Sequence, residues 1–206
     1  MSSSFGSVTF AALFAVLFLI ALAPNLSVLI VTTRAAASGF KQGALAAFGI
    51  VVATLFYVVL ALFLLKIVAV MRPEMRHVLR LVAAMYLVWN GMGLIRNASK
   101  PPVAVLPNTQ RDAASFAMGF ILTLLNVKAL LFYLSVLPVF LNVGSLGLRG
   151  LLLLAGVVAA AGFAARLVYV SASAQGRIVP GVLKGRVLNV LAGVVTAWVG
   201  IKLVAG

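Results

Sequence analysis

The sequence predicts an all-α integral membrane protein with six transmembrane helices arranged as two inverted three-helix repeats. Of its 206 residues, 65% are hydrophobic and only 9% are charged, a composition far outside that of a soluble domain of this length. A hydrocarbon core about 30 Å thick needs roughly 20 apolar residues per helix, so the chain accommodates about six spans. Glycine and tryptophan motifs also recur in the two halves. Residues 1–206 are therefore expected to form a single transmembrane domain.

The first half of the chain contains three apolar runs, at residues 8–31, 43–65 and 75–95. Pro24 lies inside the first run and lacks an amide hydrogen, which frees a backbone carbonyl one turn earlier. We therefore expect residues 23–25 to open locally. A loop is expected over residues 32–41, and Pro73 and Glu74 suit the first turn of the third helix.

The second half contains three further runs, at residues 113–141, 148–170 and 187–204. A proline-rich connection over residues 96–111 separates it from the first half, and a loop is expected over residues 171–186. The run at 113–141 is too long for one upright span, and three residues interrupt it. A broken or tilted helix is predicted there, at Asn126, Lys128 or Pro138.

An internal repeat emerges when the two halves are compared. The first and last matched glycines are 48 residues apart in the first half and 50 apart in the second. Chance is the alternative explanation because glycine is frequent here, but the agreement in order and spacing favours a repeat. Since each half, 8–95 and 112–204, holds three spans, the second must enter the membrane in the opposite direction. The matched residues are Gly43, Gly49, Trp89 and Gly91 in the first half and Gly150, Gly156, Trp198 and Gly200 in the second.

The charge balance indicates the lipid bilayer as a partner. The net charge is +14, from 16 Lys and Arg against two acids, Glu74 and Asp112. The basic residues lie between apolar runs instead of lining one face, which argues against nucleic acid and for contact with anionic headgroups. The chain has no cysteine and one histidine, His77, so its residues support neither a metal site nor paired-carboxylate catalysis. We expect no enzyme and no cofactor.

Polar residues inside the apolar runs are the candidate functional residues, because unpaired polar groups are costly in a bilayer. Asn25 lies in the first run, with a simple proline kink as the alternative reading of its segment. Asn126 and Lys128 lie in the fourth apolar run. Lys128 is either a functional residue or a lysine whose long side chain extends toward the membrane surface. Arg166 is a second deep cation, and it is equally consistent with an interfacial position.

Several of these segments resemble the LysE/RhtB family of amino-acid exporters, which carries Pro-Gly-Pro-Asn in its first helix and Asn-Pro-Lys in its fourth. The resemblance covers nearly all of the first 140 residues. Here Leu22-Ala23 replaces the first Pro-Gly pair and Val127 replaces the second central proline, so we expect milder helix breaks than in typical members. The matching stretches are Pro24-Asn25; Gly39, Gly43 and Gly49; Tyr86-Leu87 with Gly91; Gly119-Phe120; Asn126-Val127-Lys128; and Leu137-Pro138.

The resemblance implies a six-helix exporter fold. Our first hypothesis is a secondary exporter with a substrate site between the first and fourth helices. Lys128 would face the carboxylate of an amino acid or related small zwitterion, while Asn25, Asn126 and the carbonyls opened at Pro24 would receive its ammonium group. Proton antiport is also implied by the resemblance, and Asp112 is the only acid near the fourth helix that could couple it.

Two other functions stay open at this stage. The scarcity of intramembrane acids also suits export of a lipid-like or drug-like solute. A non-transporting membrane factor that assembles or regulates another complex would instead have a filled interior, with no polar cavity around Asn25 and Lys128. In each case we expect a multi-pass protein of the cell inner membrane, and a homo-oligomer is compatible with the sequence.

The distribution of basic residues predicts that both termini face away from the cytoplasm. The loops after the first, third and fifth helices carry eight Lys and Arg, and the opposite side carries six. Under the positive-inside rule the first set faces the cytoplasm. The eight are Arg34, Lys41, Arg96, Lys100, Arg111, Arg177, Lys184 and Arg186, and the six are Lys66, Arg72, Arg76, Arg80, Arg149 and Lys202.

Overall fold

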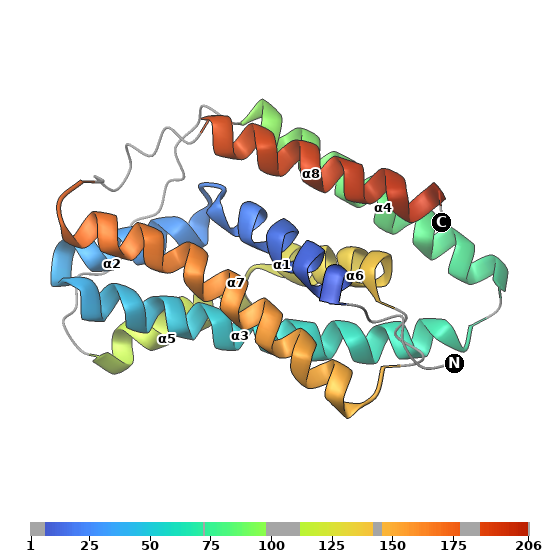
Figure 1. The fold of residues 1–206 in the computed structure, drawn as a ribbon, viewed down its shortest axis with the longest axis horizontal. Coiled ribbons are helices and arrows are strands. Elements are labelled where there is room, and N and C mark those ends of the chain that lie inside the picture. Colours follow the sequence, from blue (N-terminus) through green and yellow to red (C-terminus); the bar gives the residue numbers. More distant parts are fainter. Residues whose placement is uncertain (1–6, 72, 98–111, 142–145, 178–185, 206) are drawn as a thin grey trace.

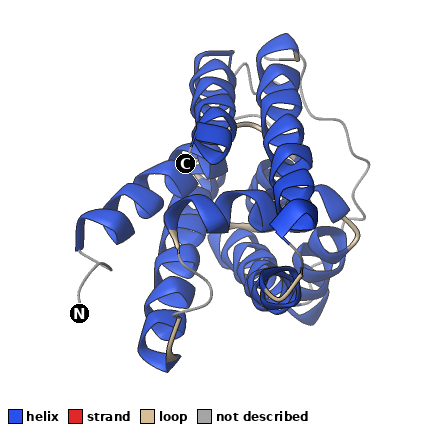
Figure 2. Ribbon diagram, turned by 90° about the vertical axis from the view of Figure 1, so that its right-hand side faces the viewer, coloured by secondary structure: helices blue, strands red, loops and turns tan. Residues whose placement is uncertain are grey.

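A computed structural model describes residues 7–71, 73–97, 112–141, 146–177 and 186–205, and within these ranges every regular element is an α-helix (Figures 1 and 2). This confirms the all-α class. Residues 98–111 of the proline-rich connection, residues 178–185 of the expected 171–186 loop and the cations Arg72, Lys100, Arg111 and Lys184 lie outside the described residues. The expected start of that loop is wrong, because residues 171–174 belong to a helix. The helices are α1 Ser7–Leu22, α2 Leu26–Ser38, α3 Phe40–Ala69, α4 Pro73–Arg96, α5 Asp112–Leu124, α6 Val127–Phe140, α7 Leu148–Ala174 and α8 Arg186–Ala205.

Two of the expected helices are broken in the middle, so the described residues form eight helices instead of six. The pair α1 and α2 bends by 65°, and the pair α5 and α6 bends by 64°. The predicted opening at residues 23–25 and the predicted break in 113–141 are thereby confirmed. The breaks occur even though Ala23 and Val127 stand where the family has glycine and proline.

Four helices in the described ranges are long and apolar enough to cross a membrane alone, and each bent pair qualifies as one further span. The structure therefore provides four to six candidate spans. The arrangement of six spans as two inverted repeats stays a prediction. The four long spans are Phe40–Val68, His77–Arg96, Leu148–Ala174 and Arg186–Leu203.

The loop expected over residues 32–41 is wrong. Helix α2 continues to Ser38 and α3 begins at Phe40, so only Gly39 separates them. Gly39 has a φ of 85°, a left-handed conformation that glycine adopts without steric cost, and its amide donates to the carbonyl oxygen of Ala35. One glycine is thus sufficient to turn the chain, because it provides both the φ angle and the capping hydrogen bond.

Close helix packing depends on glycines at two contacts. A Cβ added to Gly49 of α3 would lie 2.2 Å from the carbonyl oxygen of Phe116, and one added to Gly119 of α5 would lie 2.1 Å from that of Ala46. Only glycine allows the α3 and α5 backbones to approach this closely. Helices α4 and α8 pack together in the same way, with Gly91 and Gly193 facing each other (Figure 1).

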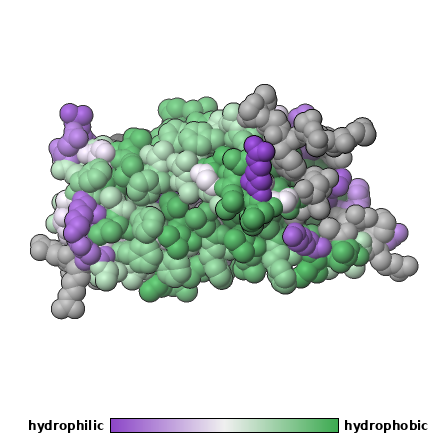
Figure 3. Space-filling view, turned by 60° about the horizontal axis from the view of Figure 1, so that its bottom comes forward, coloured by the Kyte–Doolittle hydropathy of each residue, from purple (hydrophilic) through white to green (hydrophobic). Residues whose placement is uncertain are grey.

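Large apolar side chains cover much of the outer surface. On α3, Phe48, Phe56 and Phe63 are each more than half exposed, and Trp89 of α4 is 74% exposed. Figure 3 shows a largely hydrophobic face, with the hydrophilic side chains mostly toward the two ends of the long axis. Monomeric soluble proteins rarely expose apolar patches of this extent, whereas the hydrocarbon core of a membrane solvates them favourably. The chain therefore forms a multi-pass membrane protein.

Candidate functional site

Asn25 and Asn126 occupy equivalent places in the two broken helices. Each is the residue before the second helix of its bent pair, at the start of α2 and of α6 respectively. The side-chain oxygen of Asn25 accepts the amide hydrogen of Val28 at 3.1 Å, whereas the side chain of Asn126 makes no such cap. Both breaks create helix ends inside the molecule, and the amides and carbonyls of helix ends can bind charged groups.

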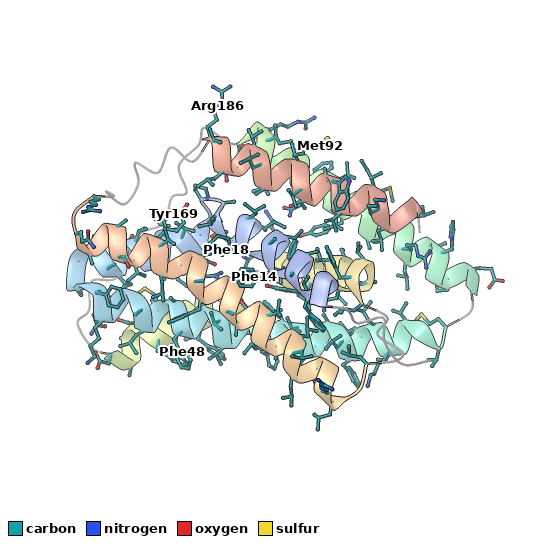
Figure 4. All side chains as sticks on the ribbon, in the orientation of Figure 1. Phe14, Phe18, Phe48, Met92, Tyr169 and Arg186 are labelled. Atoms are coloured by element: carbon teal, nitrogen blue, oxygen red, sulfur yellow. The ribbon has the colours of Figure 1, made fainter. Side chains whose placement is uncertain are left out.

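A tyrosine from the other half of the chain holds the carbonyl just before each break. Tyr57 of α3 donates its hydroxyl hydrogen to the carbonyl oxygen of Leu124 at 2.5 Å. Tyr169 of α7, labelled in Figure 4, donates to the carbonyl oxygen of Leu22, also at 2.5 Å. Both carbonyls end a helix and have no intrahelical partner. The sequence analysis missed this function because a single tyrosine in an apolar run carries no signal of its partner.

The other two predicted binding residues differ in burial. Pro24 is buried at the first break, but Lys128 is exposed in the first turn of α6. The backbone carbonyl of Lys128 accepts a hydrogen bond from the hydroxyl of Tyr86 at 2.9 Å, so α4 contacts α6 here. The structure thus places Pro24, Asn25 and Asn126 at the two breaks, and leaves the Lys128 side chain outside the buried core.

Asp112, the candidate coupling residue, belongs to a polar network at the end of the molecule where α2, α3 and α5 meet. Its carboxylate accepts from Lys41 Nζ at 2.5 Å and from Gln42 Nε2 at 2.6 Å. The amide oxygen of Gln42 accepts from the hydroxyl of Ser115, which in turn accepts from Arg34 Nη2 at 2.6 Å. The network therefore links an exposed ion pair to a buried guanidinium.

Arg34 in this network corrects the expectation that it is a loop cation. It lies within α2 and is only 1% exposed. A buried guanidinium requires hydrogen-bond acceptors, and α3 and α5 provide polar side chains at this end. The basis of the orientation prediction changes accordingly, because Arg34 was one of the eight cations counted as facing the cytoplasm.

The interior contains a second buried cation, Arg166, in the middle of α7. It is 8% exposed, and its Nη1 donates to the carbonyl oxygen of Gly162 at 2.7 Å. Its Nε is buried without a hydrogen-bond partner. The interfacial position considered for Arg166 does not fit this burial.

A cavity of about 770 Å³ lies between α3, α4, α6 and α8, away from Asn25. Aliphatic side chains form most of its lining, and Arg80, Tyr86 and Ser135 provide its polar groups. Tyr86 connects this cavity to the second helix break through its hydrogen bond to the backbone of Lys128. The cavity is therefore apolar, in contrast to the polar cavity expected for a site at Asn25 and Lys128.

The described residues contain no group of three or more His, Cys, Asp or Glu side chains that could hold a metal ion. The candidate site presents amides, carbonyls and cations. Such groups bind charged solutes by hydrogen bonds and charge attraction.

Broken membrane helices with polar residues at the break points are typical of polytopic transporters. A family model described as "LysE type translocator" matches residues 18–206, and the chain belongs to this family. It is 28% identical to the uncharacterized membrane protein slr1627 of Synechocystis over 193 residues, 93% of each chain. It is also 30% identical to the uncharacterized membrane protein YahN of Escherichia coli over 139 residues, 66% of this chain and 62% of YahN. No solved structure shows a significant match.

Proposed function

We propose that this protein is a secondary transporter that exports an amino acid or a related small zwitterion across the inner membrane. Membership of the LysE type translocator family supports membrane export in general. The observation that carries the proposal is the pair of breaks at Asn25 and Asn126, bent by 65° and 64°. Two broken helices bring helix-end amides and carbonyls and two asparagine side chains inside a membrane protein, where they can bind both ends of a zwitterion.

Different residues at the breaks bind the ammonium group and the carboxylate of the substrate. The substrate ammonium group donates to the side-chain oxygens of Asn25 and Asn126 and to backbone carbonyls before Pro24. The carbonyl oxygen of Ile20 accepts the amide hydrogen of Ala23 and that of Leu22 accepts the hydroxyl hydrogen of Tyr169, but each oxygen can accept a second hydrogen bond. Lys128 attracts the substrate carboxylate, and it must turn inward to do so because its side chain is exposed in this conformation. Helix α6 begins at Val127, so a small rotation of its first turn would move Lys128.

Alternating access would arise from movement of the two halves, 8–95 and 112–204, against each other. Helices α4 and α8 suit such a pair: Gly91 faces Gly193 and Ala197 of α8, while Gly200 faces Ala84 and Leu87 of α4. Gly91 and Gly200 are matched positions of the sequence repeat, so the packing here is consistent with two related halves. The tyrosine hydrogen bonds at each break join one half to the other.

Asp112 is proposed as the coupling residue. Its carboxylate and the Lys41 ammonium are 51% and 74% exposed, so protons from the adjacent aqueous phase can reach them. Protonation of Asp112 would remove the negative charge that holds Lys41 and would weaken its contact with Gln42. The packing of α5 against α3 at this end would then depend on pH.

Export of a lipid-like or drug-like solute is the second candidate function, and the apolar cavity of about 770 Å³ favours it. A cavity lined mainly by aliphatic side chains suits a hydrophobic solute better than a zwitterion. Arg80 at this cavity would then bind an acidic headgroup.

The decisive experiment measures solute export from cells with and without the protein. Cells are loaded with single amino acids by feeding dipeptides, and internal and external amino acids are followed in time. Export of at least one amino acid above the level of empty cells supports the proposal. Export of acyl compounds or hydrophobic dyes alone would support the second candidate, and no export of either would indicate a non-transporting factor. Gln175→Ala changes an exposed residue directly after α7 and should export like wild type, so it is the control for substitution as such.

A further inference from the structure

Arg166 is a buried cation well inside α7, away from either end of the helix. It is eight residues before the end of α7 at Ala174, roughly 12 Å along a straight helix. Its guanidinium bends back toward Gly162, one turn deeper, and bonds to that carbonyl oxygen at 2.7 Å. A Cβ at position 162 would lie 3.1 Å from Nη1, so the glycine leaves room for the charge.

The direction of the side chain argues against a cation that merely reaches the membrane surface. Long basic side chains near helix ends extend toward the nearer interface. Arg166 points the other way, from the nearer end of α7 toward the middle of the helix. The side chain is only 8% exposed, so its charge is held inside the protein.

No carboxylate of the chain neutralises this charge. The entire sequence contains two acids, Glu74 and Asp112. Glu74 is exposed in the first turn of α4, and Asp112 is exposed at the start of α5 and paired with Lys41. A buried cation without a counter-charge is strongly destabilising, so its retention requires an anion from outside the chain. The buried, unbonded Nε of Arg166 offers such an anion a donor.

The geometry points to Arg166 as the group that binds the carboxylate of the transported solute inside the protein. Tyr133 of α6 lies near enough to interact electrostatically with Arg166, and its hydroxyl provides a second donor from the helix that follows the second break. The planar guanidinium can bind both oxygens of a carboxylate at once. The assignment rests on the proposed export of a zwitterion, and it gives Lys128, which is exposed on α6, the earlier contact with the carboxylate.

Anion binding by the purified protein tests this assignment without any export measurement. Sodium acetate replaces the sodium salt of a bulky sulfonate at constant ionic strength, and the midpoint of thermal unfolding in detergent is recorded. Wild type should show a saturable rise, since a ligand that binds only the folded state stabilises it. Arg149→Met removes an exposed cation from the same helix and should keep the rise. Arg166→Met should lose it, and should itself unfold at a higher temperature without acetate because the unpaired charge is gone.

Three results would overturn the assignment: an unchanged acetate response in Arg166→Met, an equal response of wild type to chloride, or a lower unfolding midpoint of Arg166→Met without acetate. Arg166→Lys keeps the positive charge but loses the planar guanidinium, so it tests the assignment if Arg166→Met does not fold. The rise in unfolding temperature with acetate must be smaller in Arg166→Lys than in wild type. An unchanged rise would also overturn the assignment.

Export assays then separate this inference from the proposed function. Arg166→Met should export about 10- to 100-fold more slowly than wild type, as expected for loss of hydrogen bonds to a charged group, while Arg149→Met exports normally. If Arg166→Met exports like wild type, the inference fails and the function stands. If wild type binds acetate through Arg166 but exports no amino acid, the function fails and the anion site stands.

Discussion

At the scale of single residues, burial separates the two deep cations, of which the sequence analysis assigned only Lys128 to the substrate site. Lys128 and Arg166 both lie well inside apolar runs, but the structure exposes the first and buries the second. The difference arises from their neighbours. The Arg166 guanidinium lies over Gly162, where the missing Cβ leaves room for it, whereas Lys128 lies in the first turn of α6 beside a break.

Lys128→Met should abolish export with little loss of folded protein in the membrane. Methionine keeps most of the side-chain stem while it deletes the charge that attracts the carboxylate. Lys128→Arg should also fail, because a wide planar group does not fit where a compact ammonium did. Export rates normalised to membrane protein levels provide the check. Normal export by Lys128→Met would mean that the lysine only reaches the surface.

Asn25→Ala should destabilise the protein by about 1 kcal/mol, since alanine cannot accept the Val28 amide hydrogen that Asn25 now caps. Asn25→Ser should cost much less, because serine is an equally good cap. Denaturant or thermal unfolding in detergent measures both variants. Equal losses for the two would show that the capping bond does not hold the break.

At the scale of elements, the broken helices are stabilised by contacts between distant parts of the chain. Tyr57 and Leu124, and likewise Tyr169 and Leu22, are brought together by the packing of α3 on α5 and of α7 on α1. A hydroxyl that satisfies an orphan carbonyl lets the helix stop inside the membrane without an unpaired polar group. Each break therefore depends on a helix from the other half.

Tyr57→Phe and Tyr169→Phe should each destabilise the protein by about 1–3 kcal/mol, because each leaves a partly buried carbonyl without its hydrogen bond. The two effects should add in the double variant, since the hydrogen bonds join different helices and share no partner. Thermal unfolding in the same detergent measures all three. A double variant no less stable than either single one would contradict the role given to these hydroxyls.

Gly49→Ala should destabilise the protein by about 1–3 kcal/mol, because the new Cβ would collide with the backbone of Phe116. Gly156→Ala is the matched control, since nothing lies within 4 Å of the Cβ it would introduce. It should be neutral or stabilising by up to about 1 kcal/mol, as expected for alanine in a helix. Similar losses in both variants would indicate that helix propensity, not close packing, determines the outcome.

At the scale of the whole molecule, the two halves share some features of a repeat and differ in others. Asn25 and Asn126 both follow a break, and Gly91 and Gly200 both lie at the contact of α4 with α8. Gly49 and Gly156 are matched in sequence, yet only Gly49 is closely packed. The inverted repeat stays a prediction, because residues with the same spacing do not all have the same neighbours.

The orientation in the membrane is the prediction that belongs to this scale. Both termini are expected to face away from the cytoplasm, with the Lys41 and Asp112 end of the molecule inside. A reporter that is active only in the cytoplasm, fused after residue 206, should therefore be inactive. An active reporter would reverse the orientation and place the polar network on the outer side.

The sequence alone determined the properties that depend on local composition. Its apolar runs predict membrane helices, and the family motifs predict membership. Pro24 predicts the first break, and the length of the 113–141 run with its interruptions at Asn126, Lys128 and Pro138 predicts a break or a tilt in that run. A bilayer and a proline act on a segment whatever its neighbours are.

Only the tertiary structure decided which polar groups meet. Arg34 was interpreted as a loop cation and is buried, and Asp112 was interpreted by its position in the chain and is held by Lys41 and Gln42. Tyr57 and Tyr169 were not singled out, although each satisfies a carbonyl at a break. These contacts join residues 67 to 147 positions apart, and their formation depends on how whole helices pack, which no local pattern encodes.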